Sequence, residues 1–367
     1  MSGFPSRNAG EAEPIPIGSC VPLTRSTNNH AFLPVGSLIE RARYPQLSAR
    51  YPRVEGLSST TVTVAQNEYR FSATDGLGHV LISCGVNGQP GLFSADGGLT
   101  WTNSALPNAP YWSGVAYGGG RWVIVRPASN AAAYSSDGIN WTGATLPSSA
   151  GWYHVVFGGG RFVSGPYDSA ITAYSDDGGG TWSAGGSRVG GSAWGSLAFG
   201  GGRFVSLADG GTYACYSDDF GASWTAATTL PVSGYWVSTQ YVGGRFVAVP
   251  YNGTSVLSSP DGITWSVLGT LPATRQWSLA GGDSAGVLFA YARDVNECAT
   301  SPDGVTWTLR PLPNNGTPSR VATGIGSLGR IVLPAGVNGK IDLVVPDSPG
   351  ATHMLLGGPA GYHVRVR

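Results

Sequence analysis

The sequence predicts an all-β fold, a β-propeller of about seven four-stranded blades, and three observations lead to this prediction. A short segment that ends in tryptophan recurs six times at nearly constant spacing. The 57 glycines are spread through the chain without a three-residue period, as many tight turns between short strands require. The 12 tryptophans and 16 tyrosines supply large aromatic side chains for packing between sheets.

The spacing of the recurring segment indicates the size of one blade. Its copies run from SADGGLTW to SPDGVTW and end at Trp101, Trp141, Trp182, Trp224, Trp265 and Trp307, at intervals of 40, 41, 42, 41 and 42 residues. This period is close to the ~40–45 residues of a four-stranded propeller blade. We therefore assign one blade to each copy.

Each unit contains the same four expected strands. Runs such as VVFGGGRFVSG place two apolar stretches around a glycine turn, which is typical of a β-hairpin. A third strand with Tyr-Ser, the aspartate turn and a fourth strand follow, and Leu-Pro ends the blade because proline cannot donate to a sheet ladder. We expect the arginines of the glycine turns to pair with acidic residues of the aspartate turns; they are Arg121, Arg161, Arg203, Arg245 and Arg330.

The two ends of the repeat region predict how the ring closes. After the sixth unit, residues 321–345 repeat the first three strands without an aspartate turn. Residues 60–66 (TTVTVAQ) form a spare alternating strand that would pair there and remove an exposed edge. Seven blades follow from this closure, with six and eight as alternatives. We divide the chain into an irregular N-terminal attachment or oligomerisation segment (1–55), the propeller (56–345) and a C-terminal tail (346–367) for which packing on the N-terminal segment is one option.

Charge and composition argue against several classes of protein. The formal net charge is zero and 11% of residues are charged, so the sequence offers no basic stripe for nucleic acid. The N-terminal residues lack the apolar core of a signal peptide, and no run approaches the ~18 apolar residues of a membrane helix, so we expect neither secretion by a signal nor membrane insertion. The cysteines Cys20, Cys84, Cys215 and Cys298 lack metal-ligand spacing, so we interpret them as buried free thiols and expect no metal or other cofactor.

The aspartate turns carry a resemblance to a known family. They match the pattern Ser-x-Asp-x-Gly-x-Thr-Trp, so the chain resembles the Asp-box (BNR) propellers of the sialidase type, and the shorter copies such as SPDGITW are similar to repeats of phage tail proteins. Residues 32–51 resemble the tail-collar segment of phage tail fibres, although Pro-Val stands where Cys-Asp usually precedes Gly-Ser. Residues 362–366 are similar to the Tyr-x-Arg-Val motif at the C-terminus of many such fibres.

This resemblance implies a place and partners for the protein. It implies a virion protein of a tailed bacteriophage, made in the host cytoplasm without a signal peptide. The N-terminal segment would then contact other tail or baseplate proteins, the propeller would face a host glycan or receptor, and a homotrimer is one possible assembly.

We interpret the aspartates of the boxes as scaffold rather than catalytic residues. An aspartate in a tight turn accepts hydrogen bonds from nearby backbone amides, and a residue repeated in every blade marks the blade rather than a site. These residues are Asp96, Asp137, Asp177, Asp219, Asp261 and Asp303.

A second periodic feature lies at the opposite end of each unit and provides candidate glycan-binding residues. Five tryptophans each precede the second strand by nine residues and either ring the mouth of the central funnel or pack between blades; they are Trp112, Trp152, Trp194, Trp236 and Trp277, with Arg70 and Val321 at the same position in the first and last blades. The loops after the second strands add Arg126, Tyr167, Asp168, Asp209, Tyr251, Asn252, Arg293 and Asp294. Aromatic faces beside polar groups are what a sugar-binding surface needs.

These features favour a non-enzymatic adhesin that binds a host surface glycan, with a purely architectural virion protein and a glycan-degrading enzyme as alternatives. A sialidase needs an arginine cluster, for which Arg70, Arg126, Arg188, Arg275, Arg293 and Arg320 are available, and a glutamate beside a tyrosine. Only Glu68 and Glu297 lie in the propeller region. A carboxylate pair could still come from Asp168, Asp209, Asp283 and Asp294.

Overall fold

The computed structural model describes the main part of the chain as β-sheet. The described residues are 20–22, 32–34, 38–40, 56–63, 69–84, 90–107, 112–190, 193–282, 288–312, 331–335, 340–347, 353–355 and 362–365. None of them is helical, and none lies in a helix that could cross a membrane. The chain divides into two compact units: Met1–Val54 with Thr352–Arg367, and Glu55–Ala351.

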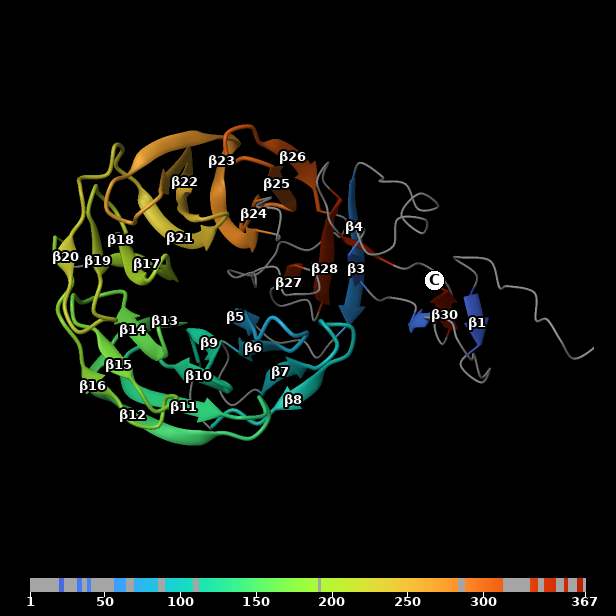
Figure 1. The fold of residues 1–367 in the computed structure, drawn as a ribbon, viewed down its shortest axis with the longest axis horizontal. Coiled ribbons are helices and arrows are strands. Elements are labelled where there is room, and N and C mark those ends of the chain that lie inside the picture. The colour runs from blue at the N-terminus through green and yellow to red at the C-terminus, as the bar shows by residue number, and fades with distance from the viewer. Residues whose placement is uncertain are drawn as a thin grey trace, which may run out of the picture. The chain divides into compact units, whose positions relative to one another are not determined.

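The larger unit is a ring of antiparallel sheets arranged in chain order, each built from consecutive strands (Figure 1). The first sheet contains β5 (Tyr69–Thr74), β6 (Val80–Cys84), β7 (Gly91–Ser94) and β8 (Thr102–Ser104). The second contains β9 (Val115–Gly118), β10 (Arg121–Val125), β11 (Ser129–Ser135) and β12 (Thr142–Ala150). The third contains β13 (Trp152–Gly158), β14 (Arg161–Pro166), β15 (Ala173–Ser175) and β16 (Ser183–Ala184).

The ring continues with a fourth sheet of four strands and a fifth sheet that is larger. The fourth contains β17 (Trp194–Gly200), β18 (Arg203–Ala208), β19 (Ala214–Ser217) and β20 (Thr225–Ala226). The fifth has six strands: β21 (Tyr235–Val242), β22 (Arg245–Ser259), β23 (Ser266–Gly282), β24 (Leu288–Ala292), β25 (Glu297–Ser301) and β26 (Thr308–Pro311).

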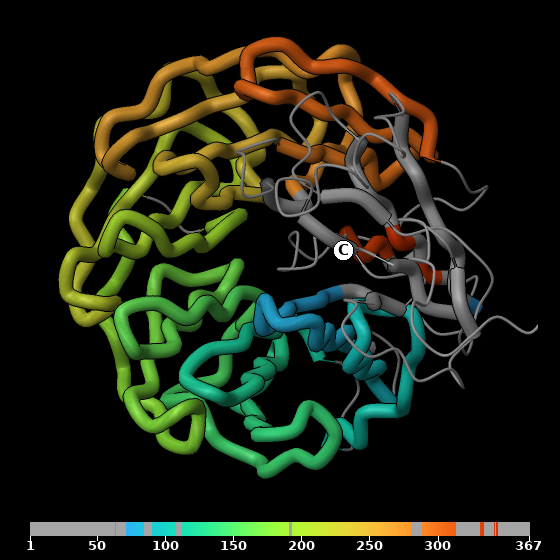
Figure 2. The backbone as a smooth tube through the Cα atoms, turned by 45° about the vertical axis from the view of Figure 1, so that its right-hand side comes forward, coloured from blue at the N-terminus to red at the C-terminus, as the bar shows by residue number. Residues whose placement is uncertain are grey.

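A three-stranded sheet joins the two ends of the ring. It contains β27 (Ile331–Ala335), β28 (Lys340–Asp347) and β4 (Gly56–Thr63), and β4 pairs with β28 along its whole length, from Lys340 opposite Thr63 to Asp347 opposite Gly56. Strands β4 and β28 lie side by side in Figure 1. The tube view follows the described chain around the ring from the first sheet to the fifth (Figure 2). The predicted pairing of the spare strand near residue 60 with the end of the repeat region is confirmed.

The prediction of seven four-stranded blades is wrong. Hydrogen bonding divides the described strands of the ring into five blades, four of four strands and one of six, beside the three-stranded closing sheet. The reason lies in β22 and β23, which are 15 and 17 residues long and run through register shifts instead of stopping at a loop. The pairs Tyr251–Gln276 and Gly253–Arg275 keep the ladder continuous, so β23 ends one repeat and begins the next.

The hydrophobic core lies between consecutive sheets. The first strands of neighbouring sheets contact each other at the centre, β5 with β9, β9 with β13, β13 with β17, and β17 with β21 (Figure 1). Buried side chains from both sheets fill each interface; between the third and fourth sheets, for example, Val163, Trp194 and Phe204 pack together. The two cysteines whose side chains are described, Cys215 and Cys298, are buried and free, as predicted.

The aspartate turns connect the third and fourth strands of a repeat and are held by their own side chains. In the copy at residues 175–182, the Ser175 hydroxyl donates to Asp177 Oδ1 (2.8 Å) and accepts from the Gly179 amide (2.8 Å). The Thr181 amide and hydroxyl donate to the two oxygens of Asp177, at 2.9 and 2.8 Å. These hydrogen bonds, that of the Thr181 amide first, hold the pKa of Asp177 below its usual value of 3.8 against the opposing effect of burial.

The repeated arginines link neighbouring sheets at the end that carries these turns. Arg161 pairs with Asp176 of its own repeat and donates to the Phe220 carbonyl of the next repeat at 3.2 Å. Arg203 pairs with Asp218 at 2.8 Å and donates to the carbonyl of Asp261. The predicted pairing is confirmed for these two arginines, whereas Arg330 lies outside the described residues.

The smaller unit consists of short strands from both ends of the chain. Strand β30 (Tyr362–Arg365) lies between β1 (Cys20–Pro22) and β2 (Phe32–Pro34), and β29 (His353–Leu355) pairs with β3 (Leu38–Glu40). The role of this unit as a virion anchor stays a prediction.

Candidate functional site

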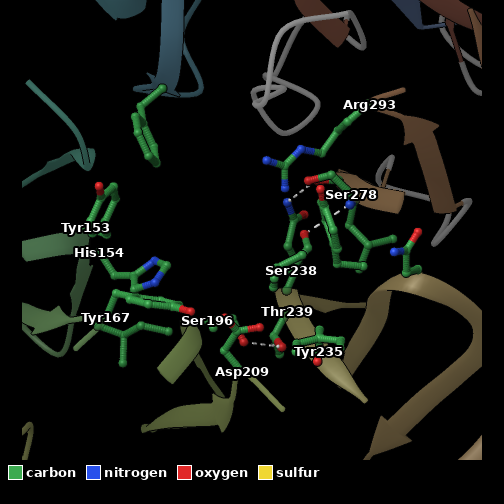
Figure 3. Close-up of a pocket in the computed structure, with 18 residues that line it drawn as sticks. Tyr153, His154, Tyr167, Ser196, Asp209, Tyr235, Ser238, Thr239, Ser278 and Arg293 are labelled. Atoms are coloured by element: carbon green, nitrogen blue, oxygen red, sulfur yellow. Dashed lines mark hydrogen bonds between the residues drawn. The ribbon is translucent and has the colours of Figure 1, made fainter. Parts of the chain in front are cut away.

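A pocket of about 800 Å³ lies at the centre of the ring, among the first strands of the sheets (Figure 3). Strands β5, β13, β17, β21 and β23 provide part of its lining. Residues in or directly after the second strands of the third to sixth repeats provide the rest. This pocket, which we call the central pocket, has the size of ordinary small-molecule sites, roughly 300–1,000 Å³.

β-Bulges place side chains from the first strands in the central pocket. In β13, Trp152 pairs with Pro166 while His154 pairs with Gly165, so Tyr153 is the extra residue of a β-bulge. Bulges re-aim side chains in this way, and Tyr153 lines the pocket while its neighbour Trp152 is fully buried between sheets. The same shift follows Trp194 in β17 and leaves Gly195 at the pocket wall.

The residue that follows the second strand differs from one repeat to the next and forms a second part of the lining. We call this place the corner position. It is occupied by Arg126 after β10, Tyr167 after β14, Asp209 after β18, Tyr251 within the continuous β22, and Arg293 after β24, and all but Arg126 line the central pocket.

Tyr167 and Asp209 form a polar pair at the wall of the pocket. The Tyr167 hydroxyl donates to the Asp209 carboxylate, and this hydrogen bond, with desolvation and the negative charge of Asp209, raises the pKa of Tyr167 to about 12. Tyr167 therefore stays protonated at neutral pH, and the residue is 41% exposed at the pocket wall. The Tyr153 ring lies 6.2 Å away in an edge-on arrangement.

His154 contributes an uncharged imidazole to the same wall. Desolvation, assisted by the positive charge of Arg188, lowers the pKa of His154 from 6.5 to about 4, against the opposing effect of a hydrogen bond with the Trp194 backbone. Since the imidazole is neutral at pH 7, the charged side chains among the described lining residues are Asp209 and Arg293.

Arg293 and Tyr251 form the opposite wall. The guanidinium carbon of Arg293 lies 5.3 Å from the centre of the Tyr251 ring, within the range of a cation–π contact. Polar side chains lie between the two walls; the Ser196 and Thr239 hydroxyls are 2.8 Å apart, and Gln240 donates to the Leu279 carbonyl at 3.0 Å (Figure 3). The pocket thus combines aromatic faces with fixed donors and acceptors.

Of the two arrangements left open for the repeated tryptophans, the structure shows packing between blades and not a ring of exposed indoles. Each of the five side chains is at most 4% exposed: Trp112, Trp152, Trp194, Trp236 and Trp277. Their indoles pack between sheets, and three of them donate their N–H to the chain just before them, as Trp152 does to the Ser148 carbonyl at 3.0 Å. The prediction that they present a stacking surface is wrong, because a buried ring has no face left for a sugar.

Sequence reasoning missed the residues beside these tryptophans. Phe71, Tyr153, His154, Ser196 and Tyr235 line the central pocket, and Tyr153 and Tyr235 flank a repeated tryptophan directly. The usable signal was the variation at such positions, since a residue that changes between otherwise similar repeats cannot serve a common structural role.

The groups needed for glycoside hydrolysis do not converge among the described residues. Arg188 is buried and donates to the carbonyls of Pro166 and Ser169, and Arg275 pairs with Glu297 at 3.0 Å. Asp168 and Asp294 accept hydrogen bonds from backbone amides, at 2.9 and 3.3 Å, and do not line the pocket. Glu68, Asp283, Arg320 and Val321, and the Arg70 side chain, lie outside the described residues. The described residues also contain no cluster suited to a metal ion.

Fold and repeat together define the class of this protein as an all-β propeller with a BNR/Asp-box repeat. A family model described as "BNR/Asp-box repeat" matches residues 173–184, which include the turn around Asp177. Comparison with curated proteins gives no match.

Solved structures with the same fold include both binding proteins and enzymes. A structure titled "YCF48 bound to D1 peptide" has a TM-score of 0.62 and 16% identity over 80% of this chain and 99% of that one. Virginiamycin B lyase from Staphylococcus aureus, in a catalytically inactive form with quinupristin, has a TM-score of 0.68 and 12% identity over 79% and 99%. A GH74 enzyme from Niastella koreensis has a TM-score of 0.56 and 17% identity over 78% and 44%. These identities show the fold and nothing finer.

Proposed function

We propose that the protein is a non-enzymatic carbohydrate-binding propeller and that the central pocket binds the glycan. The observation that carries this proposal is the lining itself: the tyrosines at positions 153, 167, 235 and 251 surround one pocket together with Asp209, Arg293 and several hydroxyl and amide groups. Flat aromatic faces pack against the C–H faces of a sugar ring, while a few fixed polar groups bind its hydroxyls.

The charges of the pocket lining nearly balance, which favours binding of an uncharged or weakly charged ligand. Asp209 and Arg293 are opposite in sign, and both His154 and Tyr167 are neutral at pH 7. A carboxylate that already accepts a hydrogen bond from a tyrosine retains lone pairs for sugar hydroxyls, and a guanidinium offers several donors. Binding of a glycan would therefore depend on hydrogen bonds and stacking more than on net charge.

We propose binding without hydrolysis because hydrolysis of a glycoside ordinarily uses two carboxyl groups. Among the described lining residues, Asp209 alone carries one. The biological setting, adhesion of a phage tail fibre to a host-surface glycan, is part of the proposal and rests on the resemblance of residues 32–51 and 362–366. The virion location and the tail or baseplate partners rest on the same ground.

A glycan array followed by calorimetric titration tests the proposal. We expect the protein to retain at least one bacterial surface glycan and the variants Tyr235→Ala and Tyr167→Ala each to bind it about tenfold more weakly, the equivalent of about 1.4 kcal/mol for one lost stacking contact. Tyr213→Ala is the matched control, because Tyr213 is 51% exposed yet lies outside the central pocket.

Three results would contradict the proposal. The first is an array without any bound glycan, and the second is an equal effect of all three tyrosine variants. The third is release of reducing ends from the bound glycan, which would replace binding by hydrolysis. A peptide array run in parallel examines the main competitor, since the YCF48 propeller was solved with a peptide.

A further inference from the structure

A second cavity adjoins the central pocket and has a different character. It encloses about 260 Å³ between the fourth repeat and the fifth, and we call it the side cavity. The two cavities share three wall residues: Tyr235, Tyr251 and Asn252. A ligand that reaches these three residues from the central pocket therefore also contacts the border of the side cavity.

The side cavity is lined by uncharged groups and by exposed backbone. Four of its residues are glycines: Gly210, Gly211, Gly234 and Gly253. A Cβ at Gly234 would lie 3.0 Å from the Trp236 ring, and Gly210 and Gly211 have φ values of +90° and +104°, which other residues rarely adopt. Hydroxyl groups of Ser233, Thr254 and Ser255 complete the polar lining. Such a lining suits a compact, neutral group with many hydroxyls.

Tyr235 is the residue that connects the two cavities. Its side chain is 53% exposed, although its backbone is held on both sides, by pairing with Tyr251 and by a bridge to Asp209. It is drawn at the edge of the central pocket in Figure 3. A half-exposed aromatic residue that is held at its backbone and borders both cavities is suited to contact one ligand that occupies them both.

Asn252 borders both cavities, as Tyr235 does. Its backbone has a φ of +63°, in the left-handed region that asparagine tolerates better than most residues, and its side chain is exposed. The amide group thus lies at the boundary of both cavities, where it can donate to one sugar unit and accept from another.

From these contacts we infer that the ligand is a chain of at least two sugar units, which extends from the central pocket past Tyr235 and Asn252 and places a neutral unit in the side cavity. This inference rests on the proposed function, because it names the kind of glycan that the same site takes. A single sugar would leave one of the two cavities empty.

The test compares chain lengths in the wild type and in one blocked variant. The probes are labelled fragments of two, four and eight sugar units, prepared from one polysaccharide that the glycan array retains. We expect the wild type to bind the longest fragment at least tenfold more tightly than the shortest, because a longer fragment reaches the side cavity as well. In Ser233→Trp, whose new side chain would fill the side cavity, we expect that rise to disappear while the shortest fragment still binds.

Ser149→Trp is the matched control. Ser149 and Ser233 each lie three residues before a repeated tryptophan and are exposed, but Ser149 lies outside both cavities. The control should keep the full dependence on chain length, and thermal unfolding should show that both variants are folded.

The outcomes separate this inference from the proposed function. Equal affinity for all fragments in the wild type, or an unchanged rise in Ser233→Trp, would overturn the extended ligand and leave glycan binding intact. Loss of the rise in both tryptophan variants would also overturn it, because the side cavity would then have no special role. Failure of the wild type to bind any fragment would remove both proposals together.

Discussion

His154 shows how burial determines the charge of a single pocket residue. Its imidazole has a pKa of about 4 in the folded protein, whereas an exposed histidine titrates near 6.5. The unfolded chain therefore binds a proton at a higher pH than the folded chain does. The stability that His154 contributes is complete above pH 6.5 and is lost as the pH falls from 6.5 towards 4.

We predict that His154→Gln makes the protein less sensitive to mild acid. Between pH 7 and pH 4.5 the wild type should lose about 2 kcal/mol more unfolding free energy than the variant, as the difference between the two pKa values requires. Urea unfolding at both pH values measures this. The box aspartates interfere little, because their pKa values lie below 3.8 and their stabilisation is lost only in stronger acid. Equal losses in both proteins would refute the assignment.

At the scale of residues, the sequence predicted part of the pocket lining but not which side chains are exposed. Tyr167, Tyr251 and Arg293 were expected in the site and line the pocket, whereas the repeated tryptophans are buried. Composition cannot tell which neighbour on a strand faces the pocket, because a bulge between Trp152 and His154 changes the alternation locally. The position of a bulge depends on contacts between strands that the local sequence does not contain.

At the scale of elements, consecutive sheets interlock through glycine and aromatic residues. The glycine that ends each of three first strands lies against an aromatic ring of the next sheet; the pairs are Gly118 with Phe157, Gly158 with Phe199 and Gly200 with Tyr241. A Cβ on Gly158 would lie 2.1 Å from the Phe199 ring. Glycine is required at these positions because the ring of the next sheet occupies the space that a Cβ would need.

We predict that Gly158→Ala destabilises the protein by about 2 kcal/mol or more, since the Phe199 ring must move out of a packed interface. Gly143→Ala is the control, because no atom lies within 4 Å of the added Cβ in strand β12. The control should stay within about 1 kcal/mol of the wild type. Thermal unfolding of the three proteins gives the comparison, and similar melting temperatures would show that the interface is loose.

The repeat predicted the strands of a unit well but not the number of blades. Hairpin turns and strand order followed from local patterns such as the glycine turn before Arg161. The number of blades depends on whether hydrogen bonding stops between repeats, and in the fifth sheet it continues through Arg275 and Gln276. Nothing in the spacing of the tryptophans distinguishes that junction from the others.

At the scale of the whole molecule, pairing between residues far apart in the chain closes the ring. Strand β4 covers the edge of β28, and an uncovered edge of eight residues would present unpaired backbone groups to other molecules. Closure therefore contributes to solubility as well as to stability.

We predict that a fragment of residues 55–351, which matches the larger compact unit, folds as a monomer with a melting temperature near that of the full chain. A fragment of residues 65–351 lacks β4 and should associate or precipitate, because β28 is then open along its whole length. Size-exclusion chromatography and thermal unfolding distinguish the two. A monomeric, equally stable shorter fragment would mean that the ring does not depend on this strand.

The corner position has a consequence for how such a molecule could change over time. The corner position holds arginine, tyrosine, aspartate, tyrosine and arginine in five repeats, although the strands before it keep the same order and pairing: Arg126, Tyr167, Asp209, Tyr251 and Arg293. Under the proposed function, mutation at the four of these places that line the central pocket would alter ligand binding at little cost to folding, because the aromatic core and the box turns lie elsewhere. The residues that line the pocket and the residues that stabilise the fold would then be separate sets, and a library randomised at Tyr167, Asp209, Tyr251 and Arg293 would sample new specificities on an unaltered fold.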